Sequence, residues 1–304
     1  LTTIAEHCHE RMEIELHRGG YAWGCLSRRL VCGCLHGVDI SEEAVEIAKL
    51  RLWLAVAVGD TAPTPLPDLE FNVRTADSLL EDRSIVETVV DGQQRLPLED
   101  RDRLQNDYIS AVEHYQAAGI DDPVAQHRLL VQLEEAQRPY QAGLGAIPAR
   151  SGKRGKKHST KGSGTDGTTV PFAWKLHYAP IFRGGRAGFD IVIANPPYVR
   201  IQSFNKSLKD PYKARWAVLR EKSADLYYAF IELALELSAP GGQIAYIMPN
   251  FSRSGAGASL RNLLANEATI RLWVDFDDTQ VFPSASNYVA LLFADRNPSQ
   301  DSSF

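Results

Sequence analysis

The segment FDIVIANPPYVR, residues 189–200, constrains the fold of this chain more than any other stretch. An apolar, β-branched run ends there in Asn195, which is followed by two prolines and a tyrosine. Proline has no backbone N–H to donate and cannot continue a central strand. The pattern therefore predicts a buried strand that ends at a stiff corner, with a polar amide before the corner and an aromatic ring, Tyr198, after it.

Two shorter segments show the strand–helix–strand pattern of a parallel α/β sheet. The run LHGVDI (35–40) predicts a strand, and Ser41 then begins a helix with apolar residues at helical spacing. The run EFNVRTADSLL (70–80) predicts a second strand. An acid closes each strand, Asp39 in the first and Asp77 in the second, and open α/β sheets bind their ligands at such carboxyl ends.

Composition adds only broad limits to this pattern. Of the 304 residues, 44% are hydrophobic and 23% are charged, as in ordinary soluble globular proteins. No apolar run has membrane-spanning length and no signal segment is visible, which favours a cytoplasmic protein with no membrane partner. The net charge of −5 decides little about nucleic acid, because a local basic face matters more than the sum.

Changes in composition along the chain predict four segments. Residues 1–80 hold the first strand–helix–strand unit, and residues 81–148 are polar and helical in pattern, as in an insertion. Residues 149–170 are rich in Gly, Ser and Lys and cannot bury enough apolar surface to order themselves. They predict a flexible basic linker, with contact to phosphates as the functional alternative. Residues 171–304 carry the Asn-Pro-Pro-Tyr corner.

Two groups of metal-site or nuclease-like residues favour structural interpretations. The four cysteines lie within the first 34 residues, but only Cys32-x-Cys34 is closely spaced, so reduced, packed thiols are favoured over a zinc site. The letters EIAK (46–49) are nuclease-like, yet on a helix they predict a solvated face with an i,i+3 pair between Glu46 and Lys49. We therefore predict no metal site.

The C-terminal part predicts alternating helices and strands. Residues 224–242 predict an apolar helix that stops at the pair Gly241-Gly242, a common helix end. A buried strand, QIAYIMPN (243–250), follows, and then a helix over residues 254–266 and two further strands. This order continues the α/β pattern of the N-terminal part.

The corner itself has a chemical interpretation. At the carboxyl end of a strand it can aim two acceptors, the Asn195 side-chain oxygen and the Pro196 carbonyl, at one point. Two fixed acceptors suit an exocyclic amine with two N–H bonds, and holding both hydrogens frees the lone pair of the nitrogen. Tyr198 would supply a flat face for the ring that carries the amine, and a base bound in this way leaves its duplex. The corner predicts a socket for a planar amine or amide, with a plain strand-terminating turn as the alternative.

The segment IVIANPPYV resembles motif IV of the adenine-N6 DNA methyltransferases. The surrounding sequence is similar to the TaqI-like catalytic domain of type IIG restriction–modification enzymes and their large phage-defence relatives. The resemblance implies an α/β, class I methyltransferase (Rossmann-like) fold, with a mostly parallel sheet and helices on both faces. Further segments occur in that family's order and rough spacing and cover most of residues 35–296: HGVDISEEAVEIAKLRLWLA, EFNVRTADSLL, FAWKLHYAPIF, DLYYAFIELALEL, GGQIAYIMPN and WVDFDDTQVFPSASNYVALL.

The resemblance also implies a cofactor, S-adenosyl-L-methionine. Asp39, with Ile40 beside it, matches the acid that binds the ribose hydroxyls of the cofactor. Asp77 matches the acid that receives the adenine amino group of the cofactor, and Ser78 offers a backbone N–H next to it. A helix-flanking acid and an N-cap are the structural alternatives for the two aspartates.

The catalytic and target-base residues follow from the same resemblance. Asn195, Pro196, Pro197 and Tyr198 match the catalytic corner, and Phe282 matches the second aromatic wall of a pocket for a flipped adenine, with a core phenylalanine as its alternative. The implied reaction is direct methyl transfer to the adenine N6 amine (EC 2.1.1.72), with double-stranded DNA as the partner. C5-cytosine methyltransferases need a nucleophilic cysteine after a proline, and no cysteine in this sequence follows a proline.

One part of the family pattern has no counterpart in the sequence. The glycine-rich cofactor loop and the strand before it are expected ahead of Leu1. Because that strand lies at the centre of the family's sheet, a chain without it leaves two central strands with unpaired backbone groups. We therefore expect a piece of a longer protein, whose N-terminal region and target-recognition domain lie outside this chain.

Two other functions stay open at this point. The Asn-Pro-Pro-Tyr motif also serves protein-glutamine and some ribosomal-RNA methyltransferases, whose acceptors are likewise planar amides or amines. The second alternative is a truncated, inactive remnant that binds nucleic acid. Binding of S-adenosylmethionine separates this remnant from the enzymes, and methyl transfer to duplex DNA separates the DNA enzyme from the others.

Overall fold

The structure, a computed structural model, describes residues 23–59, 65–80, 98–117, 172–182, 187–221, 223–252, 255–276 and 289–297, with five residues between 128 and 135. The chain divides into two compact units, residues 1–78 with 83–170 and residues 79–82 with 171–304. The finer division into cofactor side, insertion and linker stays a prediction, because most of residues 81–171 lie outside the described ranges.

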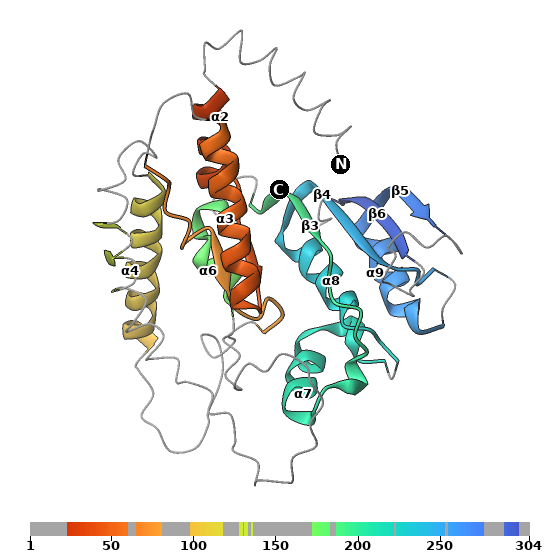
Figure 1. Cartoon of the computed structure of the whole chain (residues 1–304). Coiled ribbons are helices and arrows are strands. Elements are labelled where there is room, and N and C mark those ends of the chain that lie inside the picture. Colours follow the sequence, from red (N-terminus) through yellow and green to blue (C-terminus); the bar gives the residue numbers. More distant parts are fainter. Residues whose placement is uncertain are drawn as a thin grey trace, which may run out of the picture. The chain divides into compact units, whose positions relative to one another are not determined.

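The first unit contains the predicted strand–helix–strand segment (Figure 1). Its strands β1 and β2 pair in parallel, with α3 between them in the chain, which confirms the expected order. The Ser41 hydroxyl accepts from the Ala44 N–H at 3.2 Å and caps α3 as the sequence predicts. The described elements are α2 (Trp23–Gly33), β1 (Gly37–Asp39), α3 (Glu42–Gly59), β2 (Val73–Thr75) and α4 (Leu98–Ala117).

The buried amide of Asn72 connects α2 to both strands. Its side chain donates to the carbonyls of Cys32 at 2.8 Å and Leu35 at 3.0 Å, where a helix end leaves carbonyls without partners in the helix. Its own carbonyl accepts from the Gly37 N–H at 2.8 Å. Asn72 thus joins the end of α2, the start of β1 and the turn before β2.

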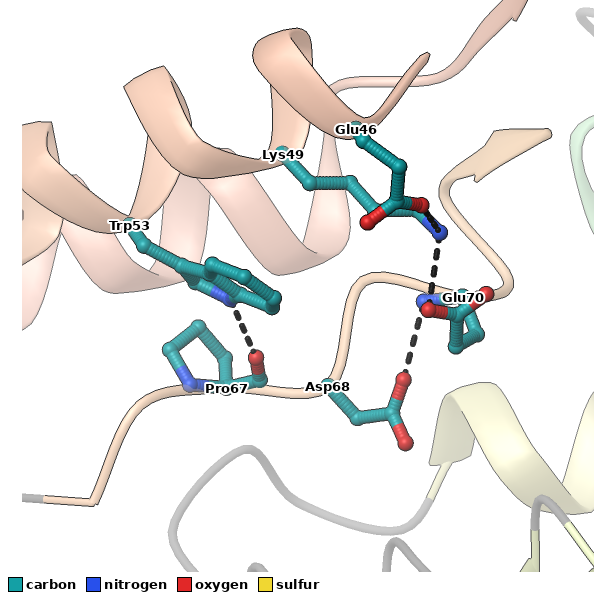
Figure 2. A network of polar contacts seen from close by, with 6 residues as sticks. All are labelled: Glu46, Lys49, Trp53, Pro67, Asp68 and Glu70. Carbon is teal, nitrogen blue, oxygen red and sulfur yellow. Dashed lines mark hydrogen bonds and ion pairs between the residues drawn. The ribbon is translucent and has the colours of Figure 1, made fainter. Parts of the chain in front are cut away.

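The prediction that this face of α3 is solvated is wrong at Lys49, which is buried (Figure 2). The ion pair with Glu46 is present at 3.0 Å, but the Lys49 side chain is 4% exposed and its ammonium also contacts Glu70 at 2.7 Å. Burial opposes the charge, yet the hydrogen bonds to Glu70 and Glu46 raise the pKa of Lys49. Trp53 Nε1 donates to the Pro67 carbonyl at 2.8 Å. The segment before β2 covers this face of the helix, which helical periodicity alone does not reveal.

The second unit contains a four-stranded sheet in the order β3-β4-β6-β5 (Figure 1). β3 and β4 are parallel, and β6 is antiparallel to β4 and to β5, so three of these strands point one way. The α/β class that the sequence predicts is confirmed. The described elements are α6 (Trp174–His177), β3 (Phe189–Ala194), α7 (Lys206–Arg215), α8 (Tyr227–Leu237), β4 (Ser238–Pro249), α9 (Ala258–Glu267), β5 (Ala268–Asp275) and β6 (Val289–Arg296), with short 3-10 turns at Ala179–Phe182, Ile201–Ser203, Ala217–Leu219 and Gly255–Gly257.

The core of this unit lies between one face of the sheet and the helices α8 and α9. Ile244 and Met248 of β4 and Leu292 of β6 are each at most 1% exposed and belong to the same cluster as the apolar residues of both helices. The Tyr246 hydroxyl donates to the Phe230 carbonyl in α8 at 2.9 Å. The helix predicted over residues 254–266 is observed as α9, although it begins at Ala258.

The prediction that β3 is a buried strand is wrong for one of its faces. Ile191 and Ile193 are 63% and 73% exposed. β3 lies at the edge of the described sheet, and the described helices α8 and α9 cover the opposite face. Among the described residues β1 pairs only with β2, and β3 pairs only with β4. Both β1 and β3 therefore keep one edge without a described strand partner.

The glycine pair does not stop a helix, as the sequence predicts, but lies inside β4. Helix α8 ends at Leu237 and β4 begins at the next residue. Gly241 has φ +72°, and a Cβ on Gly242 would lie 2.8 Å from the carbonyl oxygen of Phe189 in the neighbouring strand. The register between β3 and β4 shifts at this point. The pair therefore forms an irregularity that lets the two strands approach closely.

Two remaining predictions concern thiols and membranes. Cys32 is half-buried and Cys34 is exposed, and both are free thiols, so the prediction of packed thiols is wrong for Cys34. Burial raises the pKa of Cys32 to about 11. Across the described ranges, none of the helices combines the length and the apolar character needed to cross a membrane.

Candidate functional site

The two acids of the first unit meet at one edge of its sheet. Asp39 closes β1 and pairs in register with Thr75, the last residue of β2. The Ala76 N–H donates to the Asp39 carbonyl at 2.9 Å, which continues the pairing beyond β2. Asp77 follows directly, so the parallel pairing brings the backbones of the two aspartates to the same carboxyl edge.

The Asp39 carboxylate lies in a tight turn at the start of α3. Its Oδ1 accepts from the Ser41 N–H at 2.8 Å, and the residue is exposed. The turn leaves Oδ2 able to accept from a ligand hydroxyl, which suits a carboxylate with several acceptor sites. Ile40 beside it is 59% exposed and offers an apolar surface at the same edge.

Asp77 and Ser78 lie in a more enclosed environment. Asp77 is 4% exposed, whereas Ser78 is half-buried. The edge therefore holds one exposed acid, Asp39, and one buried acid, Asp77. A ligand with both hydroxyl and amino groups could use this pair.

The Asn195–Tyr198 corner of the second unit lies at the end of a strand, as the sequence predicts. β3 ends at Ala194, and Asn195 to Val199 form an extended loop without regular pairing. Asn195 is exposed, Pro196 is buried and Pro197 is exposed. Burial of Pro196 and its fixed φ hold the backbone that carries the Asn195 side chain.

The Tyr198 hydroxyl lies against both Asn195 and the neighbouring strand. Its Oη is 3.1 Å from Asn195 Oδ1 and 3.2 Å from the carbonyl oxygen of Ile247 in β4. Its ring meets the Tyr227 ring edge-on, with centroids 6.4 Å apart. Burial raises the pKa of Tyr198, so the hydroxyl keeps its proton at neutral pH.

The chain after Tyr198 is held by the segment that begins α8. The Leu226 N–H donates to the Val199 carbonyl at 2.8 Å, and the Ile201 N–H donates to the Ala224 carbonyl at 3.1 Å. Burial raises the pKa of Asp225 although the Arg200 charge lowers it. Two backbone hydrogen bonds thus attach the chain after Tyr198 to the residues just before α8.

The predicted site residues belong to both units. Asp39, Ile40, Asp77 and Ser78 belong to the first unit, and the Asn195–Tyr198 corner belongs to the second. Phe282 lies outside the described residues, so its role in a base pocket stays a prediction. Sequence reasoning missed the Ile247 carbonyl, because a main-chain acceptor leaves no side-chain signature.

Comparison with protein families accounts for most of the chain. The model of the Eco57I restriction-modification methylase family matches residues 33–282, a range that includes both aspartates and the Asn195 corner. The chain belongs to this family. The resemblance to type II restriction–modification methyltransferases that the sequence motifs indicate is thereby confirmed.

Curated relatives of this Eco57I-family chain carry related names. It is 36% identical over 110 residues to the type II methyltransferase M.XhoI of Xanthomonas vasicola, covering 36% of the chain and 20% of the relative. It is 30% identical over 120 residues to the type II restriction enzyme and methyltransferase RM.Eco57I of Escherichia coli, covering 38% and 12%. In both cases the chain spans a fifth or less of the relative's length.

Two further similarities extend over different shares of the chain. A 284-residue alignment at 26% identity covers 77% of the chain and 23% of a type II restriction enzyme and methyltransferase, RM.MjaORFECS2P, of Methanocaldococcus jannaschii, whose assignment is itself provisional. The second similarity is to a solved structure from Listeria monocytogenes, provisionally assigned as a class I S-adenosylmethionine-dependent methyltransferase. The match covers 37% of this chain and 33% of the Listeria chain, at 17% identity and a TM-score of 0.31.

Proposed function

We propose that this chain forms part of the catalytic domain of a DNA methyltransferase in a restriction–modification system, which transfers a methyl group from S-adenosyl-L-methionine to the N6 amine of a flipped-out adenine. Membership of the Eco57I family supports the reaction class. The observation that carries the choice of acceptor is the Asn195–Tyr198 corner, with an exposed carboxamide at the end of β3 and an aromatic ring beside it.

The protein's part in the proposed reaction is to hold the acceptor amine. The Asn195 side-chain oxygen and the Pro196 carbonyl accept its two N–H bonds, so the nitrogen lone pair is no longer committed to the ring. Buried Pro196 and the backbone hydrogen bonds after Tyr198 hold the main chain of the corner, and groups on a backbone that needs little rearrangement contribute most to a transition state. Tyr198 supplies a face for the base, which leaves its duplex to reach the corner.

The residues at the edge of the first unit fit the proposed cofactor. Asp39, with one carboxylate oxygen held by Ser41, would accept from the ribose hydroxyls, and Ile40 would contact the adenine ring. Asp77 and Ser78 would bind the adenine amino group and its ring nitrogen. When bound, S-adenosylmethionine supplies an electrophilic methyl group, so the protein needs no nucleophile of its own.

Replacing Asp39 by asparagine tests the cofactor part of this proposal. Asparagine keeps one oxygen for the Ser41 N–H but replaces the second acceptor by an N–H₂ group that cannot accept from a hydroxyl. We expect S-adenosylmethionine to bind about tenfold more weakly, the usual value of one hydrogen bond to a charged group. Isothermal titration of the protein expressed from the complete gene measures this change.

Glu42→Gln is the matched control, because it removes an exposed acid from the first turn of the same helix. We expect this variant to bind the cofactor as the unaltered protein does. Absence of S-adenosylmethionine binding by the unaltered protein would contradict the proposed function and favour a non-catalytic member of the family.

A further inference from the structure

The Tyr198 hydroxyl faces two oxygens but has a single proton. Its Oη lies within hydrogen-bond distance of both Asn195 Oδ1 and the Ile247 carbonyl, and each of these atoms can only accept. The hydroxyl can donate to one of them at a time. In the observed orientation, therefore, one of the two short contacts has no hydrogen between its oxygens.

A half-turn of the Asn195 carboxamide gives both short contacts of the Tyr198 hydroxyl a hydrogen. The turn brings Nδ2 to the position of Oδ1, so that an amide N–H donates to Tyr198 Oη and the Tyr198 O–H donates to the Ile247 carbonyl. The carboxamide then points Oδ1 away from Tyr198, on the exposed side of the corner. In the observed orientation, by contrast, the hydroxyl faces the Asn195 oxygen and leaves only one of its two lone pairs for a substrate amine.

The backbone explains why the Ile247 carbonyl accepts from a side chain. Pairing between β3 and β4 ends at Ala194 and Tyr246, and Ile247 is the next residue of β4. Neither Pro196 nor Pro197 has an N–H that could continue the pairing. The Tyr198 hydroxyl provides a donor at the point where the prolines cannot.

We infer that the Tyr198 hydroxyl is a positioning group. It accepts a hydrogen bond from the Asn195 amide N–H and donates one to the Ile247 carbonyl, and in this way it aims the Asn195 oxygen at the acceptor amine. This inference rests on the proposed function, but it assigns the hydroxyl a role that is separate from the contact of the ring with the base. The ring is held independently, by its edge-on contact with Tyr227 and by the backbone hydrogen bond between Leu226 and Val199.

Tyr198→Phe separates the two roles, because it removes the hydroxyl and keeps the ring. With the protein expressed from the complete gene, we expect the single-turnover rate of methyl transfer to duplex DNA to fall about tenfold, the effect of losing one hydrogen bond in the transition state. The dissociation constants for DNA and for S-adenosylmethionine should change less than twofold, because the ring and the cofactor residues are intact.

Tyr246→Phe is the matched control. It removes a tyrosine hydroxyl that bonds a backbone carbonyl at 2.9 Å, one residue before Ile247 on the same strand, but on the core side of the sheet. We expect a lower melting temperature and an unchanged rate. A rate in Tyr198→Phe within twofold of the unaltered protein, or an equal loss in Tyr246→Phe, would overturn the positioning role.

Asn195→Ala, measured in the same assay, keeps this outcome apart from the proposed function. A slow Asn195→Ala variant beside an unaffected Tyr198→Phe variant would overturn the positioning role alone. An Asn195→Ala variant as fast as the unaltered protein would overturn the proposed function, and the positioning role with it.

Discussion

Replacing Asn195 by alanine is expected to slow methyl transfer by roughly 10²–10³-fold, the usual consequence of removing one polar group aimed at a transition state. The exposed carboxamide at the end of β3 is one of the two acceptors that hold the amine in our proposal. Its removal leaves the Pro196 carbonyl alone, and a single acceptor cannot hold both N–H bonds. The single-turnover rate with saturating DNA and S-adenosylmethionine measures the effect.

Asn205→Ala provides the control for this substitution. The Asn205 side chain accepts from the Leu208 N–H at 3.1 Å and caps α7, so its loss costs about 1 kcal/mol of stability. We expect the melting temperature of this variant to fall and its rate at low temperature to stay unchanged. Equal rates in Asn195→Ala and the unaltered protein would mean that the corner is a turn and nothing more.

Gly188→Ala is expected to lower the free energy of unfolding of the second unit by about 3 kcal/mol or more. Gly188 has φ +129°, a conformation that side chains rarely adopt, and a Cβ there would lie 2.5 Å from Ala239 N and 2.6 Å from Ser238 C. Both are backbone atoms at the start of β4, so neither can move without displacing the strand. Urea unfolding followed by tryptophan fluorescence measures the loss.

Gly241→Ala separates backbone strain from steric conflict. Gly241 also has a positive φ, +72°, but a Cβ there would meet no atom within 4 Å. We expect this variant to lose only about 1 kcal/mol, the ordinary cost of a left-handed alanine. If the two variants proved equally stable, the close approach at Gly188 would not be a determinant of this fold.

The chain order of strands and helices could be predicted because each element carries its own signal. Ser41 and the acids after it begin α3 as expected, and the position of Asp39 and Asp77 at one edge follows from the parallel pairing of β1 and β2. Parallel strands present their carboxyl ends at the same edge, so two acids at strand ends meet whatever the details of packing.

Features that depend on contacts distant in sequence could not be predicted in this way. Lys49 is buried because the segment around Glu70 covers it, and Gly242 lies in β4 where the backbone of β3 approaches closely. The bond between Tyr198 and the Ile247 carbonyl joins residues 49 positions apart. A local pattern predicts where Asn195 lies in the chain, but it does not predict what orients its side chain.

The most direct test of the central claim is to identify the nucleoside that is methylated. Duplex DNA is incubated with S-adenosylmethionine labelled in its methyl group and the protein expressed from the complete gene, then digested and analysed by mass spectrometry, with RNA and protein substrates in parallel. We predict label in N6-methyladenine alone, with a rate of labelling that falls roughly 10²–10³-fold in Asn195→Ala. Label in 5-methylcytosine or N4-methylcytosine, or only in RNA or protein, would contradict the claim that the corner presents its two acceptors to the amine of a flipped adenine.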